Sequence, residues 1–138
     1  MKDKLKVLFI CTHNSARSQM AEGLANHYLG HKLEAYSAGT EATFVKPHAI
    51  KALAELGIDI SHHRSKTVYE FENETFDYVI TVCDHAKETC PFFPGGKNYV
   101  HKGFKDPSDV QGTEEEKLEA FRRSRDEIKE WLFGFFGE

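Results

Sequence analysis

The chain has 138 residues, a formal net charge of −4 at pH 7 and three cysteines. Its length is that of one ordinary domain, residues 1–138, which can bury a core without metal or disulfide staples. No basic stripe, export signal or long apolar run is visible, so we expect neither a nucleic-acid nor a membrane partner. The odd cysteine count argues against a disulfide framework and favours a reducing compartment. We therefore expect a cytoplasmic protein, and a monomer.

Strands and helices alternate along the chain. The strand candidates are residues 6–11, 33–37, 78–83 and 98–100; the helix candidates are 18–29, 47–56 and 113–135, with a shorter turn near 67–71. Such alternation is typical of a parallel sheet with helices on both faces. The sequence therefore predicts an α/β fold in a single domain.

Short local signals predict where the helices begin and end. Ser18 is placed to cap the first helix and Gly30 to stop it, and Pro47 and Gly57 bracket the second. Thr113, followed by three glutamates, forms a capping box for the last helix. That helix carries one apolar stripe that we expect to face the core: Leu118, Phe121, Ile128, Leu132 and Phe135.

The most informative segment follows the first strand and reads Cys11-Thr12-His13-Asn14-Ser15-Ala16-Arg17-Ser18. Between a buried strand and a helix, such a loop curls its backbone N–H groups around a tetrahedral anion. Arg17 adds a bidentate fork, and the helix contributes its positive N-terminal end. The same field favours the thiolate form of Cys11, which is the attacking species. The alternative is that Cys11 is a packing residue and Arg17 a surface charge.

Two further cysteines follow in the second half of the chain. Cys11 and Cys83 both end predicted strands, and open parallel sheets bind ligands at the carboxyl ends of their strands. Cys90 comes seven residues after Cys83, so a thiol–disulfide relay between cysteines is geometrically plausible. A zinc site from Cys83, His85 and Cys90 is one alternative, but no second ligand pair accompanies it, and we expect no metal. Two inert thiols are the other alternative.

A carboxylate follows the fourth predicted strand. Asp106, directly before Pro107, lies in a loop that leads to the same crevice, where it can protonate a departing oxygen as a general acid. Asp109 is a nearby competitor for this role, and Asp before Pro is also an ordinary start of a turn. The sequence alone leaves both carboxylates open.

Taken together, residues 11–18, the pair Cys83 and Cys90, Asp106-Pro107 and residues 111–116 resemble the thioredoxin-coupled arsenate reductases, which are built on the low-molecular-weight tyrosine phosphatase fold. The resemblance covers nearly the whole chain. It implies a four-stranded parallel sheet and reduction of arsenate to arsenite in arsenic detoxification. It also implies thioredoxin as the electron donor and no bound cofactor, with phosphate or sulfate as competing oxyanions.

The resemblance also implies a mechanism. Cys11 attacks arsenic, and Asp106 protonates the departing oxygen. Cys83 then attacks the Cys11 sulfur and arsenite leaves, after which Cys90 resolves the disulfide and thioredoxin restores the thiols. Arsenate is held by the loop residues Thr12, His13, Asn14, Ser15, Ala16, Arg17 and Ser18.

One part of the family pattern departs in this chain. Some relatives hold a potassium ion beside the loop, and three residues resemble part of that site: Asn14, Glu22 and Ser37. Residues 63–66, however, carry cations where those relatives have polar or acidic ligands. We therefore expect no potassium here, and hypothesise that Lys66 or Arg64 places its own charge beside Glu22.

Two other functions are compatible with the same loop. A phosphatase acting on phosphotyrosine uses Cys11 as nucleophile and Asp106 as acid and then base. Ser108 follows Asp106-Pro107 where such enzymes usually offer an aromatic ring, and Cys83 and Cys90 have no role in that reaction. A non-catalytic oxyanion sensor is the third possibility, and it predicts that Cys11→Ser leaves function intact.

Overall fold

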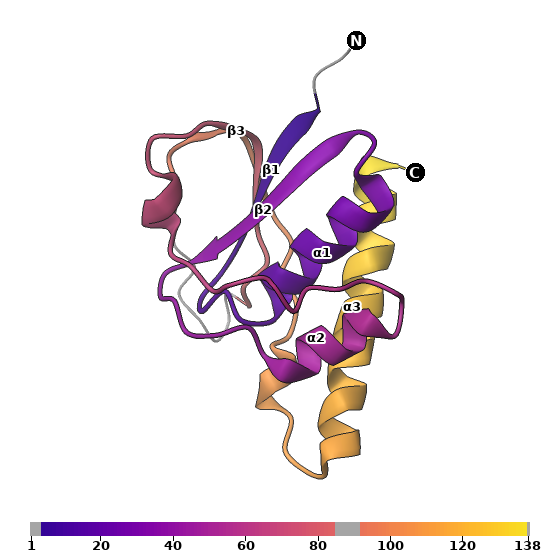
Figure 1. Cartoon of the computed structure of the whole chain (residues 1–138). Helices are drawn as coiled ribbons and strands as arrows, with labels where there is room; N and C mark the ends of the chain where they lie inside the picture. Colours follow the sequence, from indigo (N-terminus) through magenta and orange to yellow (C-terminus); the bar gives the residue numbers. More distant parts are fainter. Residues whose placement is uncertain (1–3, 85–91, 138) are drawn as a thin grey trace.

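A computed structural model describes residues 4–84 and 92–137 (Figure 1). The strands are β1 (Leu5–Cys11), β2 (Leu33–Gly39), β3 (Phe76–Thr81) and β4 (Gly96–His101). The α-helices are α1 (Arg17–Leu29), α2 (Pro47–Ala54) and α3 (Glu114–Phe136), and two short 3-10 helices are η1 (Val68–Phe71) and η2 (Pro107–Asp109). None of the described helices is both long and apolar enough to cross a membrane.

The four strands form one parallel sheet, as predicted. Their order in the sheet is β2-β1-β3-β4. The apolar run of β1 lies between two neighbours, which explains why its side chains are buried on both faces. Cys11 pairs with Gly39 of β2, and Ile10 pairs with Thr81 of β3. The carboxyl ends of β1, β2 and β3 therefore meet at one edge of the sheet.

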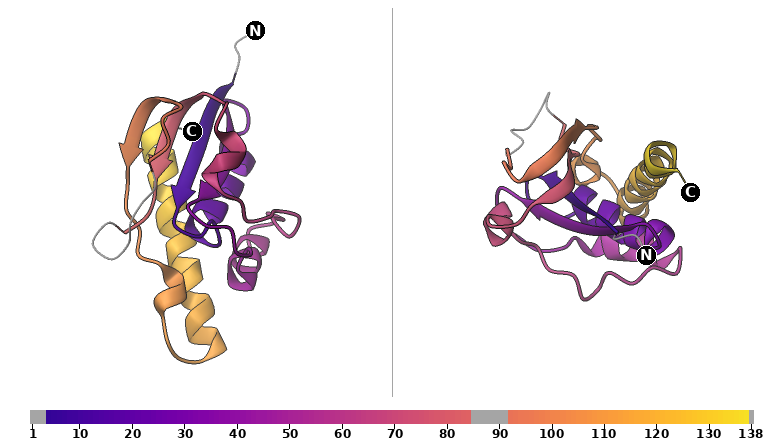
Figure 2. Two further views of the ribbon diagram at one scale, coloured as in Figure 1. Left: turned by 90° about the vertical axis from the view of Figure 1, so that its left-hand side faces the viewer. Right: turned by 90° about the horizontal axis from the view of Figure 1, so that it is seen from above.

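Alternate side chains of β1 enter two separate cores. Val7 and Phe9 join the core under α1 and α3, whereas Leu8 and Ile10 point to the other face. That second face is covered by η1, through Phe71, and by other aromatic side chains instead of a long helix. Figure 2 shows α3 running along one side of the sheet, so the helical cover is uneven between the two faces.

The ends of the helices test the local signals. Thr113 caps α3 with the full capping box, and Pro47 is the first residue of α2, as predicted. The expectation that Ser18 caps α1 is wrong, because α1 begins at Arg17 and Ala16 occupies the cap position without a side-chain hydrogen bond. The Ser18 hydroxyl instead contacts Cys11.

The apolar stripe of α3 is correct except at its end. Leu118, Phe121, Ile128 and Leu132 are buried, but Phe135 is 40% exposed and stacks on Trp131 with ring centroids 5.0 Å apart. A helix drifts by about 20° per heptad, so the stripe that starts near Phe121 has turned away from the core by Phe135.

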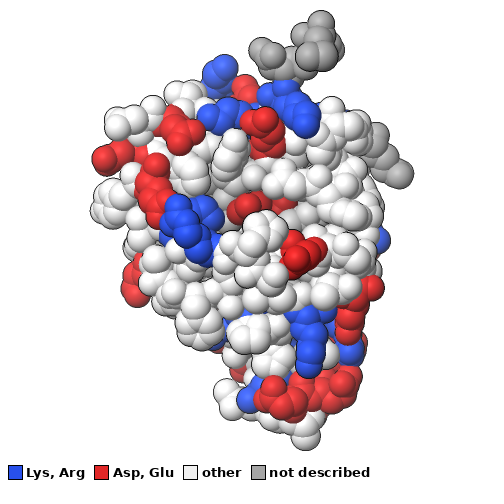
Figure 3. All heavy atoms as spheres, viewed as in Figure 1, with Lys and Arg blue, Asp and Glu red and all other residues white. Residues whose placement is uncertain are grey.

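The predicted strand ends also shift by a few residues. β3 ends at Thr81, so Cys83 lies beyond the strand and not within it. The Val82 amide still donates to the Ile10 carbonyl at 2.9 Å, which keeps the chain beside β1 as it leaves the sheet. Acidic and basic side chains are interspersed on the face shown in Figure 3, in line with the modest net charge of −4.

Candidate active site

The oxyanion loop, residues 11–18, joins β1 to α1 at the carboxyl edge of the sheet. Its carbonyl groups are held from outside: the Thr12 carbonyl accepts from the Thr40 amide, and the Ser15 carbonyl from the Lys46 amide, both at 2.9 Å. The C=O and N–H of one peptide plane point in opposite directions, so the amides that follow these carbonyls turn inward. Asn14, with a left-handed φ of 50°, makes the turn. The loop is thus shaped to hold a tetrahedral anion.

Gly39 lets β2 end directly against this loop. A Cβ atom at Gly39 would lie 2.7 Å from the carbonyl oxygens of Cys11 and Thr12, and 2.8 Å from the Asn14 amide nitrogen. These neighbours are backbone atoms, so a larger residue displaces the loop itself. The oxyanion loop therefore depends on a glycine that the sequence analysis did not single out.

Cys11 is a buried free thiol whose Sγ lies 2.8 Å from the Ser18 hydroxyl. Asn14 Nδ2 donates to the same hydroxyl at 2.7 Å. The Asn14 amide is oriented by its Oδ1, which accepts from Gln19 Nε2 and from the Lys66 amide, both at 2.9 Å. Because the Ser18 hydroxyl accepts from Asn14, its hydrogen is available to the Cys11 sulfur.

Arg17 is buried at the start of α1 and is held on two sides. Its Nη1 donates to the Phe104 carbonyl at 3.1 Å, and its Nη2 lies 3.5 Å from Asp106 Oδ2. These two contacts fix the orientation of the guanidinium. The sequence could not indicate this role of Phe104, because the acceptor is its backbone carbonyl, which every residue has.

Asp106 and Asp109, the two candidate acids, lie at opposite ends of η2. Asp106 caps η2 by accepting from the Ser108 amide at 2.9 Å through Oδ1, which turns Oδ2 toward Arg17. Asp109 is exposed. The structure thus brings the Asp106 carboxylate to the guanidinium of the oxyanion loop.

Cys83 is fully buried just beyond β3, next to the end of β1. Its Sγ lies 3.9 Å from the Thr12 hydroxyl and 3.7 Å from the carbonyl oxygen of Ile10. Cys83 is disulfide-bonded, whereas Cys11 is free. Cys90 and His85 lie outside the described residues. Within the described ranges, no three His, Cys, Asp or Glu side chains are grouped to hold a metal ion.

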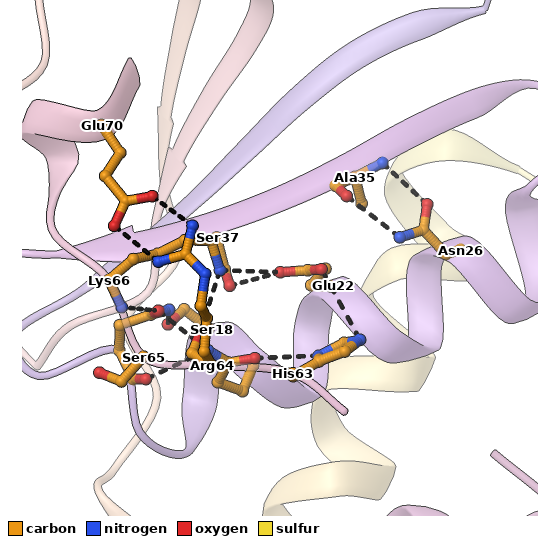
Figure 4. A network of polar contacts seen from close by, with 12 residues as sticks. Ser18, Glu22, Asn26, Ala35, Ser37, His63, Arg64, Ser65, Lys66 and Glu70 are labelled. Atoms are coloured by element: carbon orange, nitrogen blue, oxygen red, sulfur yellow. Dashed lines mark hydrogen bonds and ion pairs between the residues drawn. The ribbon is translucent and has the colours of Figure 1, made fainter. Parts of the chain in front are cut away.

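A polar network of fully and largely buried side chains, called the buried network below, lies behind the oxyanion loop (Figure 4). Ser37 Oγ donates to Glu22 Oε1 at 2.5 Å, while His63 Nε2 and Lys66 Nζ lie 3.8 and 3.9 Å from the Glu22 carboxylate. Burial lowers the pKa of His63 and the pKa of Lys66, and in both cases Glu22 opposes the effect. His63 Nδ1 also lies 3.0 Å from Gln19 Oε1. The network therefore reaches the oxyanion loop through Gln19.

The cation beside Glu22 is Lys66. Arg64, the other candidate, turns outward and pairs with Glu70 through contacts of 2.5 and 2.7 Å. A guanidinium fork matches a carboxylate with two parallel hydrogen bonds, which explains why Arg64 prefers Glu70. The hypothesis of a positive charge beside Glu22 thus holds for Lys66 and is wrong for Arg64.

Gln19 and His63 are two further residues of this site to which the sequence analysis gave no role. Gln19 is fully buried, and its Nε2 donates to Asn14 Oδ1 and to the Arg64 carbonyl, the latter at 3.0 Å. Its position directly after Ser18 is the one signal that was available. His63 carries no such signal, because its partners come from α1, which is far away in the sequence.

The known proteins that this chain is similar to are consistent with this geometry. Residues 6–138 match the family model described as low molecular weight phosphotyrosine protein phosphatase. An arsenate reductase of Halalkalibacterium halodurans is 50% identical over 126 residues, which cover 91% of each chain. The crystal structure of an arsenate reductase from Archaeoglobus fulgidus has a TM-score of 0.77 and 32% identity, and covers 96% of this chain and 99% of that one.

A thioredoxin-dependent arsenate reductase of Corynebacterium glutamicum has a TM-score of 0.65 and 30% identity, over 96% of this chain and 62% of that chain. Both the family match and the relatives span nearly the whole sequence. The chain therefore belongs to the low molecular weight phosphotyrosine protein phosphatase family and, within it, to the arsenate reductases.

Proposed function

We propose that this protein reduces arsenate to arsenite through a relay of three cysteines that thioredoxin regenerates. The observation that carries the proposal is the free Cys11 thiol at the base of an anion-shaped loop, with the Cys83 sulfur packed beside the same strand end. A phosphatase needs the first of these features and has no use for the second.

Arsenate binds in the oxyanion loop. The inward amides of the loop and the Arg17 guanidinium neutralise its charge, as expected for a phosphate-like anion. Because Arg17 already lies 3.5 Å from Asp106, the bound anion comes next to that carboxyl group. Phosphate and sulfate compete for the same donors.

The first chemical step forms a bond between Cys11 and arsenic. The thiolate attacks arsenic, and Asp106 delivers a proton to the oxygen that leaves as water. The Ser18 hydroxyl, 2.8 Å from the sulfur, supports the thiolate before the attack. The product is a Cys11–arsenic adduct with arsenic still in its pentavalent state.

The second step moves two electrons to arsenic. The Cys83 thiolate attacks the Cys11 sulfur, the sulfur–arsenic bond breaks, and its electron pair stays on arsenic. Trivalent arsenite leaves, and a Cys11–Cys83 disulfide remains. Cys90 then attacks Cys83 and frees Cys11 as a thiolate. The disulfide state of Cys83 beside a free Cys11 supports this order.

Thioredoxin completes the cycle by reducing the disulfide that Cys83 shares with Cys90. The structurally similar Corynebacterium glutamicum enzyme, which is named as thioredoxin-dependent, supports this donor. No bound cofactor is needed, because the cysteines carry the electrons. Thiols that must return to the reduced state after each cycle suit a cytoplasmic location.

The test is arsenate-dependent NADPH oxidation with thioredoxin and thioredoxin reductase. We expect the Cys11, Cys83 and Cys90 to Ser variants all to lose steady-state turnover. In a single turnover without reductant, Cys90→Ser still releases one arsenite per protein, whereas the other two variants release none. Mass spectrometry should find a Cys83–Cys90 disulfide in the wild-type protein after turnover, and its absence in an active enzyme would exclude the relay.

A weaker phosphatase activity is the second candidate, since the family model that matches is that of a phosphatase. Phosphate and arsenate have nearly the same shape, so Cys11 can form a phosphoenzyme in the same loop. Hydrolysis of p-nitrophenyl phosphate that needs Cys11 and ignores Cys83 and Cys90, without any arsenate turnover, would make this the main function.

A further inference from the structure

An aromatic groove of about 320 Å³ opens on the face of the sheet that η1 covers. Among the described residues, its lining consists of Thr40, Val68, Tyr69, Glu72, Phe92, Phe93 and Pro94, and of these only Glu72 is charged. Other hollows of the described surface are strongly charged; the one beside Trp131, for example, is lined by two lysines and two glutamates. The aromatic groove therefore suits an apolar occupant.

Two aromatic side chains of the groove are largely exposed to solvent. Tyr69 is 72% exposed and Phe92 is 74% exposed. Tyr99 of β4, itself 48% exposed, stacks on Phe92 with ring centroids 5.4 Å apart and an interplanar angle of 27°. Clustered exposed aromatics of this kind mark interaction surfaces, and the stack holds Phe92 in place before any partner arrives.

The floor of the groove is firm. Phe93 is 3% exposed and packs edge-on against Phe76 at 5.7 Å, and Val68 packs on the same buried cluster. A side chain that enters the groove therefore meets a preformed surface. Aromatic anchors around such a pocket carry most of the binding free energy in protein interfaces.

The groove is connected to the Cys83 sulfur through Thr40 and Thr12. Thr40 lines it and donates its amide to the Thr12 carbonyl at 2.9 Å, and the Thr12 hydroxyl lies 3.9 Å from Cys83 Sγ. A bridge between Gly39 and Thr67 fixes η1 beside the same end of β2. A protein seated in the groove thus lies at the edge of the sheet where the disulfide of Cys83 is found.

We infer that the aromatic groove is the docking surface for the dithiol protein that reduces the Cys83 disulfide. The inference rests on the proposed function. A thiolate of the partner attacks the Cys83 disulfide, forms a mixed disulfide with one of its two sulfurs and releases the other as a thiolate. The partner's second thiol then attacks the partner sulfur of the mixed disulfide and releases the remaining cysteine as a thiolate. Two electrons pass in this exchange: the partner leaves as a disulfide, and Cys83 and its former partner sulfur return as thiols.

The size of the groove favours this occupant over a second copy of the chain. Stable dimers bury roughly 1,200 Å² or more, whereas transient redox encounters lie below that area. A groove of about 320 Å³, with Tyr69 and Phe92 exposed in its lining, has room for one or two side chains of a partner. So small a contact fits a brief encounter with a reductant.

The experiment measures how fast the oxidised protein is reduced, without arsenate. Reduced thioredoxin or dithiothreitol is mixed with the oxidised wild-type protein, with Phe92→Ala and with Tyr69→Ala. We expect the second-order constant for thioredoxin to fall at least about tenfold in each variant, while that for dithiothreitol stays within about twofold. Phe92→Trp should restore the rate with thioredoxin.

Phe135→Ala is the matched control, because Phe135 is an exposed aromatic residue on α3, outside the groove. Unchanged thioredoxin constants in Phe92→Ala and Tyr69→Ala would overturn the inference, as would a wild-type dimer that Phe92→Ala dissociates. Loss of the proposed function is a separate result: arsenate then fails to oxidise the fully reduced wild-type protein, whatever thioredoxin does to the disulfide.

Discussion

Two networks of charged side chains in this molecule differ in their exposure to solvent. The buried network behind the oxyanion loop joins Glu22, His63 and Lys66, whose side chains are 15, 13 and 12% exposed. The surface network between α2 and α3 joins Glu55, Arg122 and Glu115, whose side chains are 34, 26 and 73% exposed.

The surface network has the shorter contacts, yet we expect it to matter less. Arg122 lies 2.8 Å from Glu55 and 2.6 Å from Glu115, whereas the contacts to Glu22 are near 4 Å. Water screens the surface pairs and already solvates each partner, so their loss costs little. A charge left alone inside the protein has no such solvation. We therefore expect burial, and not the shortness of the contacts, to decide which network contributes more to stability.

Lys66→Met should have the largest effect of the variants that probe this contrast. It leaves the Glu22 carboxylate buried without its cation, which we expect to lower the free energy of unfolding by about 3 kcal/mol. Urea unfolding followed by circular dichroism measures this value. Lys66→Arg keeps the charge and serves as the control. A loss below about 0.5 kcal/mol for Lys66→Met would mean that the buried network contributes no more to the free energy of unfolding than a surface pair does.

Ser18→Ala should come next, and its effect falls on rate instead of stability. It removes the hydroxyl that lies 2.8 Å from Cys11 Sγ. We expect kcat/KM for arsenate to fall roughly 30-fold, or about 2 kcal/mol of transition-state stabilisation. An unchanged kcat/KM would show that the Ser18 hydroxyl does not act on the Cys11 sulfur.

His63 should make the stability of the protein depend on pH. Burial lowers its pKa below the ordinary 6.5, Glu22 opposes this, and the neighbouring charges of His62, Lys66 and Asp59 also face the ring. The unfolded chain then binds a proton that the folded chain resists, so stability is lost as the pH falls below 6.5. Urea midpoints at pH 7.5 and 5.5 measure the loss, which should be smaller in His63→Gln. An equal loss in both proteins would assign it to other groups.

Arg122→Ala tests the surface network and should have a small effect. It breaks the contacts to Glu55 and Glu115, and we expect a shift in the urea midpoint of less than about one third of that caused by Lys66→Met. The shift should vanish in high salt, because salt screens exposed pairs. A shift that matches Lys66→Met would reverse the contrast between the two networks.

Exchange of sodium for potassium should have the smallest effect. Lys66 Nζ lies 3.9 Å from Glu22 Oε1 and supplies a positive charge beside that carboxylate. We expect the arsenate reduction rate to change by less than about twofold between the two salts at equal ionic strength. A strongly higher rate in the potassium salt would mean that a potassium ion binds beside Lys66 in spite of the positive charge of that side chain.

Local pattern in the sequence was enough to predict the parallel α/β fold and the loop that joins β1 to α1. The apolar run before Cys11 is continuous because β1 is buried on both faces, and the capping box at Thr113 is a contact between residues three positions apart. Features of this kind depend on neighbours in the chain. For that reason the elements were predicted within a few residues, and the loop from Cys11 to Ser18 was found by its spacing.

Only the tertiary structure decided which residues support that loop. Gln19 meets His63 across 44 positions of sequence, and Arg17 meets the Phe104 carbonyl across 87. The choice of Asp106 at the loop and of Lys66 beside Glu22 also depends on how separate elements pack. A sequence shows the side chains that a site can use, but backbone carbonyls, the burial of a charge and the approach of distant segments exist only once the chain has folded.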